Sequence, residues 1–359
     1  MAATVSLEHG ERDKNALKSI IDTLEPLDNV FLHEKTQKLF KYARARDKHE
    51  ALKNEVLDIK CKEQRRDLCR KEDERQNTAL HYAAKAGNLD TCQFLVEQGA
   101  DIKALGQNKM TPLQFAARYG DEKKGKEVWM CMKWIMEEED KKKSEGSSQK
   151  EKEIFFDGRD DFSILQHAIQ NTNWEEDPVV VWELIKTRKF NISDPDKQGN
   201  TSLHLAAQFD RQDDHTLLEN FLPPYKEKDS KGQEYIDKKD LEMCIKAENK
   251  VGMTPLHVAC AVGNSDSVEQ LLEIAREATL INVSEIINSP DSNGSLPLSL
   301  AITSKNLKMV DILMKKGARV NHESIITAAR SKLKYFRTNG RKHFLIYADK
   351  LFLELEMST

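Results

Sequence analysis

Histidine is the first residue type in this 359-residue chain that could do chemistry, because a neutral imidazole binds metals and a titrating one transfers protons. His81, His204 and His257 each follow a leucine in similar stretches of sequence. Side chains one sequence repeat apart are expected one structural step apart, which is too far for these imidazoles to share an ion. No His-Glu pair is followed by a second histidine at helical spacing, as a zinc protease would require. The histidines therefore predict a structural role.

The six cysteines offer a second kind of chemistry, since a thiolate is both a nucleophile and a metal ligand. No two of them stand in C-x-x-C spacing, so we predict no zinc site. Cys61 and Cys69 are flanked by lysine or arginine residues, and nearby cations lower the pKa of a thiol. We expect Cys61 and Cys69 to be candidate reactive thiols, with ordinary surface cysteines as the alternative. Cys92 and Cys260 are expected in the core.

Composition and the remaining motifs exclude several classes of protein. There is no glycine-rich phosphate-binding motif and no nucleophile–base pair, so we expect neither an enzyme nor a bound cofactor or metal. Lys and Arg number 56 against 60 Asp and Glu, which argues against a nucleic-acid partner. No stretch of the sequence approaches 18 uninterrupted apolar residues, so no membrane span is expected. Few cysteines and no signal peptide predict a soluble, reduced, cytoplasmic protein.

A repeated sequence must position these residues. The clearest copies are Asn77–Gly87 (NTALHYAAKAG), Met110–Gly120 (MTPLQFAARYG), Asn200–Phe209 (NTSLHLAAQF) and Met253–Gly263 (MTPLHVACAVG), with weaker copies at Phe162–Ile169 and Gly294–Ile302. In each copy a threonine or serine is expected to cap a helix, with an inward leucine and small alanines behind it. The expected caps are Thr78, Thr111, Ser163, Thr201, Thr254 and Ser295. Their spacing is irregular, but the first two lie 33 residues apart.

On these residues and this 33-residue spacing, the sequence resembles the ankyrin-repeat family over most of residues 71–321. The resemblance implies an all-α solenoid of helix-turn-helix units, here with enlarged inter-repeat loops. It also implies that the histidine after each leucine hydrogen-bonds to the neighbouring turn. Such arrays bind proteins by shape along turn tips and inner helices rather than catalyse reactions.

We expect three regions in the chain. Residues 1–70 form an N-terminal helical segment with a degenerate first repeat or cap. Residues 71–321 form the array, with insertions near 137–160 and 223–249 that are rich in charge and are expected to be loops. Residues 322–359 form a partial repeat and capping helices, because a solenoid needs covered ends.

The residues just before the expected caps vary in type, as residues that recognise a partner do. On this basis we predict partner binding at Arg75, Gln76, Asn108, Lys109, Lys197, Gln198 and Lys250. The alternative is that they are simply exposed turn residues.

The stretches Asn77–Gly99 and Met253–Leu272 are similar to the divergent cytosolic ankyrin arrays of TRPA-type transient receptor potential cation channels. Gly294–Ala301 offers a weaker parallel to the TRPV type. This resemblance implies a domain at the cytosolic face of the plasma membrane that modulates gating. Its partners would be proteins or other channel subunits, and a C-terminal region outside this chain would tether it to the membrane. The alternatives are a freestanding cytosolic adaptor or scaffold and a regulatory segment of an enzyme.

Overall fold

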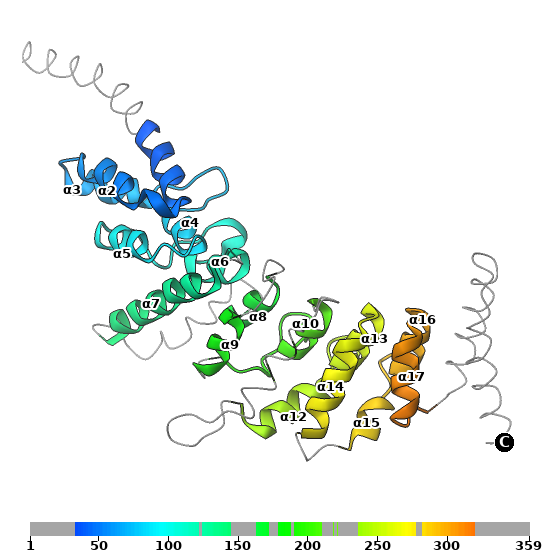
Figure 1. Cartoon of the computed structure of the whole chain (residues 1–359). Helices are drawn as coiled ribbons and strands as arrows, with labels where there is room; N and C mark the ends of the chain where they lie inside the picture. The colour runs from blue at the N-terminus through cyan, green and yellow to red at the C-terminus, as the bar shows by residue number, and fades with distance from the viewer. Residues whose placement is uncertain are drawn as a thin grey trace, which may run out of the picture. The chain divides into compact units, whose positions relative to one another are not determined.

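A computed structural model describes residues 33–121, 124–144, 163–171, 179–187, 190–209, 218, 221, 236–277 and 282–319. The described residues form helices joined by tight turns, with one isolated β-bridge between Glu72 and Thr78 (Figure 1). The expected all-α class is therefore confirmed. The chain divides into two compact units, described separately below: unit 1 is Met1–Ala116 with Met130–Gly146, and unit 2 is Ala117–Trp129 with Ser147–Thr359. The predicted C-terminal region 322–359 lies outside the described residues.

Unit 1 begins, within the described part of the chain, with helical residues 33–43. Its further elements are η1 (Arg46–Lys48), α2 (His49–Leu57), α3 (Lys62–Arg70), α4 (Ala79–Lys85), α5 (Leu89–Glu97) and η2 (Gln107–Lys109). Two helices, α6 (Pro112–Tyr119) and α7 (Gly125–Ser144), cross the boundary between the units. The hairpin pair α4 and α5 packs against α3 and α2 respectively, around Leu52, Leu68, Leu80 and Leu95, which are all fully buried.

Unit 2 repeats one arrangement of paired helices (Figure 1). Its elements are α8 (Ile164–Ile169), α9 (Val179–Lys186), α10 (Ser202–Phe209), α12 (Lys238–Lys246), α13 (Pro255–Val262), α14 (Ser265–Glu277), α15 (Val283–Ile287), α16 (Pro297–Thr303) and α17 (Leu307–Lys315). The helices α8, α10, α13 and α16 contact one another in that order and form an inner row. Each of α9, α14 and α17 packs on the inner helix that precedes it.

The inner helices begin where the sequence predicts. Thr78 and Thr254 form capping boxes, in which the threonine side chain accepts from the backbone of the third helical residue, and Ser163 does the same for α8. Pro255 occupies the first helical position, where a missing N–H is not needed. The paired alanines of the motif, such as Ala206 and Ala207, are fully buried. Small side chains at these positions therefore bring neighbouring helices close together.

One expected cap is wrong by a residue. The N-cap of α16 is Leu296, not Ser295, and Pro297 is the first helical residue. Leu296-Pro297-Leu298 thus aligns with the Thr-Pro-Leu of the other repeats. Leucine has no side-chain oxygen to accept a hydrogen bond, and the structure shows no side-chain cap there. The proline sets the start of α16, because its ring fixes φ in the helical range.

Both expected insertions contain helix, which corrects the prediction of loops. Residues 137–144 continue α7, and the second insertion contains α12, which is capped by Asp237 and contacts α10, α13 and α14. Leu241, Cys244 and Ile245 of α12 are buried, so this helix adds to the core. Residues 145–160 of the first insertion and residues 223–235 of the second lie outside the described residues.

We predict that a cavity in the core beneath the inner row of helices causes a large loss of stability. Leu203 of α10 is fully buried, so Leu203→Ala should lower the free energy of unfolding by about 2–5 kcal/mol. Met243 of α12 is 52% exposed, and Met243→Ala should change it by less than about 0.5 kcal/mol. Urea unfolding followed by circular dichroism measures both. Equal losses in the two variants would contradict the assigned core.

Candidate functional site

Each of the helices α4, α6, α10, α13 and α16 follows a five-residue turn that the structure describes. We number these turns tips 1 to 5: Asp73–Asn77, Gly106–Met110, Asp196–Asn200, Asn249–Met253 and Asp291–Ser295. In every tip the first N–H donates to the fifth carbonyl, and the fourth N–H donates to the first carbonyl, at 2.8–2.9 Å. In all but tip 2, an Asp or Asn side chain at the first position also accepts from the third and fifth N–H groups. The tips are therefore closed on themselves and leave their middle side chains outside.

The seven predicted partner-binding residues all lie in these tips and are all exposed. Tips 1 and 2 of unit 1 hold Arg75, Gln76, Asn108 and Lys109; tips 3 and 4 of unit 2 hold Lys197, Gln198 and Lys250. Whether they bind a partner stays a prediction. The sequence analysis missed tip 5, whose Ser292 and Asn293 are exposed in the same way. The signal was the spacing Asp291-x-x-Gly294, which matches tip 3.

Neighbouring tips of unit 2 are joined through their backbones. The N–H of Lys250 donates to the carbonyl of Gln198 at 2.8 Å, and the N–H of Ser292 donates to the carbonyl of Val251 at 3.2 Å. Asn249 adds a side-chain bond to Asn200 at 2.9 Å. Tips 3, 4 and 5 therefore form one continuous surface.

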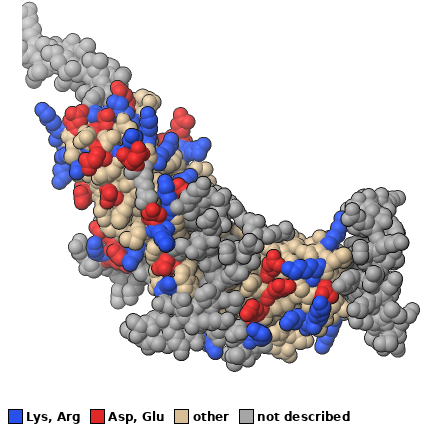
Figure 2. Space-filling view, in the orientation of Figure 1, with Lys and Arg blue, Asp and Glu red and all other residues tan. Residues whose placement is uncertain are grey.

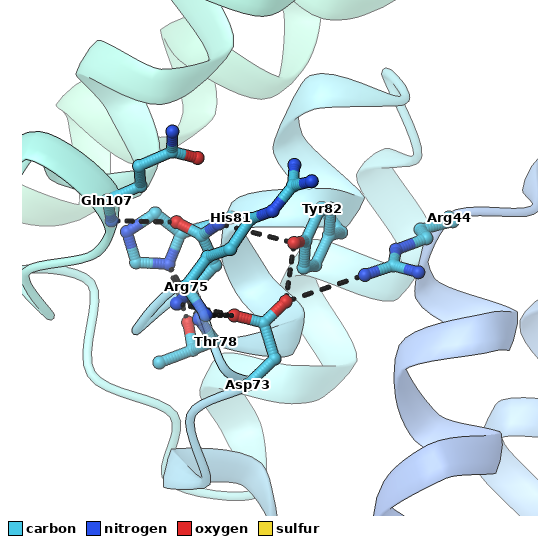
Figure 3. Close-up of polar contacts among 8 residues, drawn as sticks. Arg44, Asp73, Arg75, Thr78, His81, Tyr82 and Gln107 are labelled. Carbon is cyan, nitrogen blue, oxygen red and sulfur yellow. Dashed lines mark hydrogen bonds and ion pairs between the residues drawn. The ribbon is translucent and has the colours of Figure 1, made fainter.

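Tip 1 is held in place by a polar network (Figure 3). The Tyr82 hydroxyl donates to Oδ2 of Asp73 at 2.5 Å, and Nδ2 of Asn77 donates to the same hydroxyl at 3.2 Å. Arg44 pairs with Asp73 at 3.5 Å and lies 4.1 Å from the centroid of the Tyr82 ring. The Asp73 carboxylate is thus fully engaged in holding the turn.

The repeated histidines join one repeat to the next. Nδ1 of His81 accepts the backbone N–H of Thr78 at 3.1 Å, and its Nε2 lies 3.0 Å from the Met110 carbonyl in the next tip. Because an N–H can only donate, Nδ1 carries no proton and Nε2 donates to that carbonyl. His204 and His257 make the same two contacts within unit 2, to the carbonyls of Met253 and Ser295.

Burial keeps these imidazoles neutral. It lowers the pKa of His81 and of His204 to about 4, and it lowers the pKa of His257. Within the described ranges, no three His, Cys, Asp or Glu residues gather as a metal site would require. The structural reading of the histidines is therefore confirmed by their contacts.

Glutamine replaces histidine in two repeats, where it makes the same bond to the helix cap, and Gln166 also donates to a carbonyl beyond its own repeat. Oε1 of Gln114 accepts the N–H of Thr111 at 2.8 Å. Gln166 accepts the N–H of Ser163 at 2.8 Å and donates to the carbonyl of Asp194 at 2.9 Å. An amide thus supplies the same acceptor and donor without a titrating group.

This equivalence predicts how stability depends on pH. The unfolded histidines bind protons below about pH 6.5, whereas folded His81 and His204 stay neutral to about pH 4. Their contribution is therefore complete above pH 6.5 and is lost as the pH falls to 4, by on the order of 3 kcal/mol for each histidine. The variant H81Q/H204Q should keep both bridges and flatten this loss, as urea unfolding at pH 5 and pH 7.5 would show. An equally steep loss in the variant would contradict the assignment.

Glycine in the tips of unit 2 is required by close packing. Gly252 has φ +71°, and a Cβ there would lie 2.4 Å from the backbone N of Ser292 in the next tip. A Cβ at Gly199 would lie 3.0 Å from the N of Lys250. Gly294 has φ +81°, but a Cβ there would meet nothing within 4 Å. Packing between tips and backbone conformation can therefore be separated experimentally.

We predict that Gly294→Ala lowers the free energy of unfolding by about 1 kcal/mol, through the left-handed conformation alone. Gly252→Ala should lower it by about 3 kcal/mol, because tip 5 must also move away. The difference between the two variants, measured by urea unfolding, reports the packing of tip 4 on tip 5. Equal effects would show that the tips do not pack as described.

The cysteines require one correction. Cys69 is fully buried, and burial raises the pKa of its thiol to about 12, the opposite of the lowering expected from its cationic neighbours. Its side chain lies on the buried face of α3 beside Leu68, whereas Arg70 and Lys71 are exposed. Cys61 is exposed at the N-cap of α3, and its reactivity stays a prediction. Cys92 and Cys260 are buried as expected.

The visible face of the described residues carries charges of both signs. On the face drawn in Figure 2, Lys and Arg are interspersed with Asp and Glu over the described residues. None of the described helices is both long and apolar enough to cross a lipid bilayer. Shape and local side chains, rather than a strong field, therefore characterise the exposed tips.

Comparison with known proteins decides the family. A family model described as ankyrin repeats (3 copies) matches residues 42–127 and 233–324, which include α2 to α6 and α12 to α17. The chain contains ankyrin repeats. The crystal structure of the human ASB11 ankyrin repeat domain superposes with a TM-score of 0.51 over 79% of this chain and 99% of that one, at 18% sequence identity. Likeness at this identity confirms the ankyrin solenoid fold alone.

Two curated proteins share ankyrin sequence with the chain. Human transient receptor potential cation channel subfamily A member 1 is 24% identical over 241 residues, which is 67% of this chain and 18% of the channel. Inversin from dog is 28% identical over 206 residues, which is 56% of this chain and 15% of inversin. The chain thus spans less than a fifth of either relative. Ankyrin repeats mediate protein interactions, so this chain is a protein-interaction domain.

Proposed function

We propose that this chain is the N-terminal cytosolic part of a TRPA-type cation channel, in which its ankyrin tips bind a protein partner or another subunit and modulate gating. The similarity to the human channel over two thirds of the chain carries the proposal. The ordered tips support it, because joined and closed turns hold exposed side chains in fixed positions for a partner. The proposed location is the cytosolic face of the plasma membrane.

Long-read sequencing of the natural transcript tests the channel assignment. We expect the reading frame to continue beyond Thr359 into a region with six membrane spans. A stop codon directly after Thr359 would overturn the channel assignment. A kinase or transferase sequence downstream would overturn it as well.

A freestanding scaffold is the second candidate, because the chain is also similar to inversin, whose name does not describe a channel. Transcript sequencing separates the two, because a scaffold needs no membrane-spanning region in the same reading frame. In both candidates the tips bind protein, so the binding role does not depend on the outcome.

The channel assignment also predicts an effect of tip variants on gating. In the full-length channel, Lys250→Ala with Val251→Ala should shift the stimulus–current curve, because both side chains are exposed on tip 4. Lys316→Ala removes an equally exposed lysine at the end of α17, away from the tips, and should leave the curve unchanged. Patch-clamp recording measures both. Identical curves for the unchanged channel and both variants would show that the side chains of tip 4 have no role in gating.

A further inference from the structure

Tips 1 and 2 carry side chains in a backbone conformation that the tips of unit 2 reserve for glycine. The fourth residues of tips 1 and 2 are Gln76 and Lys109, with φ of +65° and +60°. The fourth residues of tips 3, 4 and 5 are Gly199, Gly252 and Gly294. A Cβ in this left-handed region crowds the following carbonyl oxygen, so glycine is the stable choice at all five positions.

The internal packing of unit 1 does not explain the two side chains. Among the described residues, the side chains of Gln76 and Lys109 form neither a hydrogen bond nor an ion pair, and both are exposed. Tips 1 and 2 are joined instead through Asn77, whose Oδ1 accepts the N–H of Gln107 at 2.9 Å. The strain is therefore local and has no compensating hydrogen bond or ion pair within the part of the chain that the structure describes. Uncompensated backbone strain of this kind is concentrated at functional sites.

The second strained position in tip 2 strengthens this contrast. Asn108 also has a positive φ, of +58°, and its side chain is exposed next to Lys109. Two successive left-handed residues turn both side chains outward from η2. In this respect tip 2 differs most from the glycine-containing tips of unit 2.

The chemistry of the exposed side chains indicates what they bind. Gln76 and Asn108 carry amides, which both donate and accept and so match an extended peptide backbone. Arg75 and Lys109 only donate and carry positive charge. The Asp73 carboxylate does not neutralise them, because it holds Tyr82, Arg44 and the turn N–H groups. Glu74 is the one exposed carboxylate on these two tips.

We propose that tips 1 and 2 recognise an extended, carboxylate-bearing segment of a protein partner, and that Gln76 and Lys109 keep a strained backbone for the sake of that contact. The proposal deepens the proposed function, on whose partner-binding role it rests. Carboxylates of the segment pair with Arg75 and Lys109, and its backbone bonds to the amides of Gln76 and Asn108. The Asn77 bridge and the Asp73 network hold the two tips ready for this contact.

The chain offers a matched control for strain. Lys305, in the turn between α16 and α17, is an exposed lysine with φ +60°, the same value as Lys109. Lys305→Gly removes a strained lysine away from the tips, whereas Q76G/K109G removes the two strained side chains at the proposed site. Both changes should leave the urea midpoint unchanged or raise it, since glycine relieves the left-handed strain.

The full chain would be tested on arrays of randomised 12-residue peptides whose two central residues are fixed as Glu-Glu, Gln-Gln or Lys-Lys. We expect at least tenfold tighter binding to the Glu-Glu set than to the other two. In fluorescence polarisation with the best Glu-Glu peptides, Q76G/K109G should weaken binding at least fivefold, and Lys305→Gly should leave it unchanged.

Several outcomes would overturn the inference. These are no preference for Glu-Glu peptides, equal affinity of Q76G/K109G and the unchanged chain, or a clearly lower urea midpoint in Q76G/K109G. Binding lost in Lys250→Ala but kept in Q76G/K109G would also overturn it, while leaving the partner-binding role intact. The channel assignment stands or falls separately with the transcript.

Discussion

The structure depends on buried side chains that join the start of a helix to the next turn. His81, His204 and His257 each accept the N–H of a helix cap and donate to a carbonyl one tip further on. Without the bridge the cap N–H would lose its partner, whereas the carbonyl would keep only the N–H that closes its own tip. The bridge also requires a neutral ring, which explains why burial of a histidine is tolerated here. Through this contact the starts of α4, α10 and α13 are each tied to the tip that follows.

The two units use this common frame differently. In unit 2 the tips lie against each other through backbone hydrogen bonds, and Gly199 and Gly252 leave the space that this needs. In unit 1 a side-chain bridge from Asn77 replaces the backbone contact, and residues with side chains occupy the glycine position. The first arrangement favours close packing and the second favours display of side chains. The regular repeat is thus the constant part of the molecule, and the residues of its tips are the variable part.

Much of the fold could be predicted from the sequence, because caps and small residues recur as a set. Thr78 and Thr254 identify their helices unambiguously, and the exposed positions of the seven tip residues followed from where the helices begin. The cap at Leu296 could not be predicted, because a leucine has no side-chain oxygen and the neighbouring Ser295 fits the cap pattern better. The helix α12 escaped because its many charges concealed the buried Leu241, Cys244 and Ile245. Neighbouring charges likewise suggested a reactive Cys69, although the face of α3 on which a residue lies decides its burial.

The left-handed conformation of Gln76 and Lys109 could not be predicted from the sequence. In tips 3, 4 and 5 a glycine indicates that the fourth residue has a positive φ. A glutamine or lysine at the same position does not indicate a positive φ. Gln76 and Lys109 make the same turn-closing hydrogen bonds as the glycines of tips 3, 4 and 5. These bonds exist only in the folded backbone, so the shared conformation is visible only in the structure. Residues that break the local rule of their own repeat are therefore the most informative about function.

Bonds between repeats hold the tips in place, and we expect the tips to stay ordered without a partner. Amide hydrogen exchange of the free chain, resolved by residue, tests it most directly. We expect the N–H groups of Gln107, Lys250 and Ser292, which donate from one tip to another, to exchange as slowly as those within the neighbouring helices. Exchange at the rate of an unprotected peptide at these three positions would contradict it.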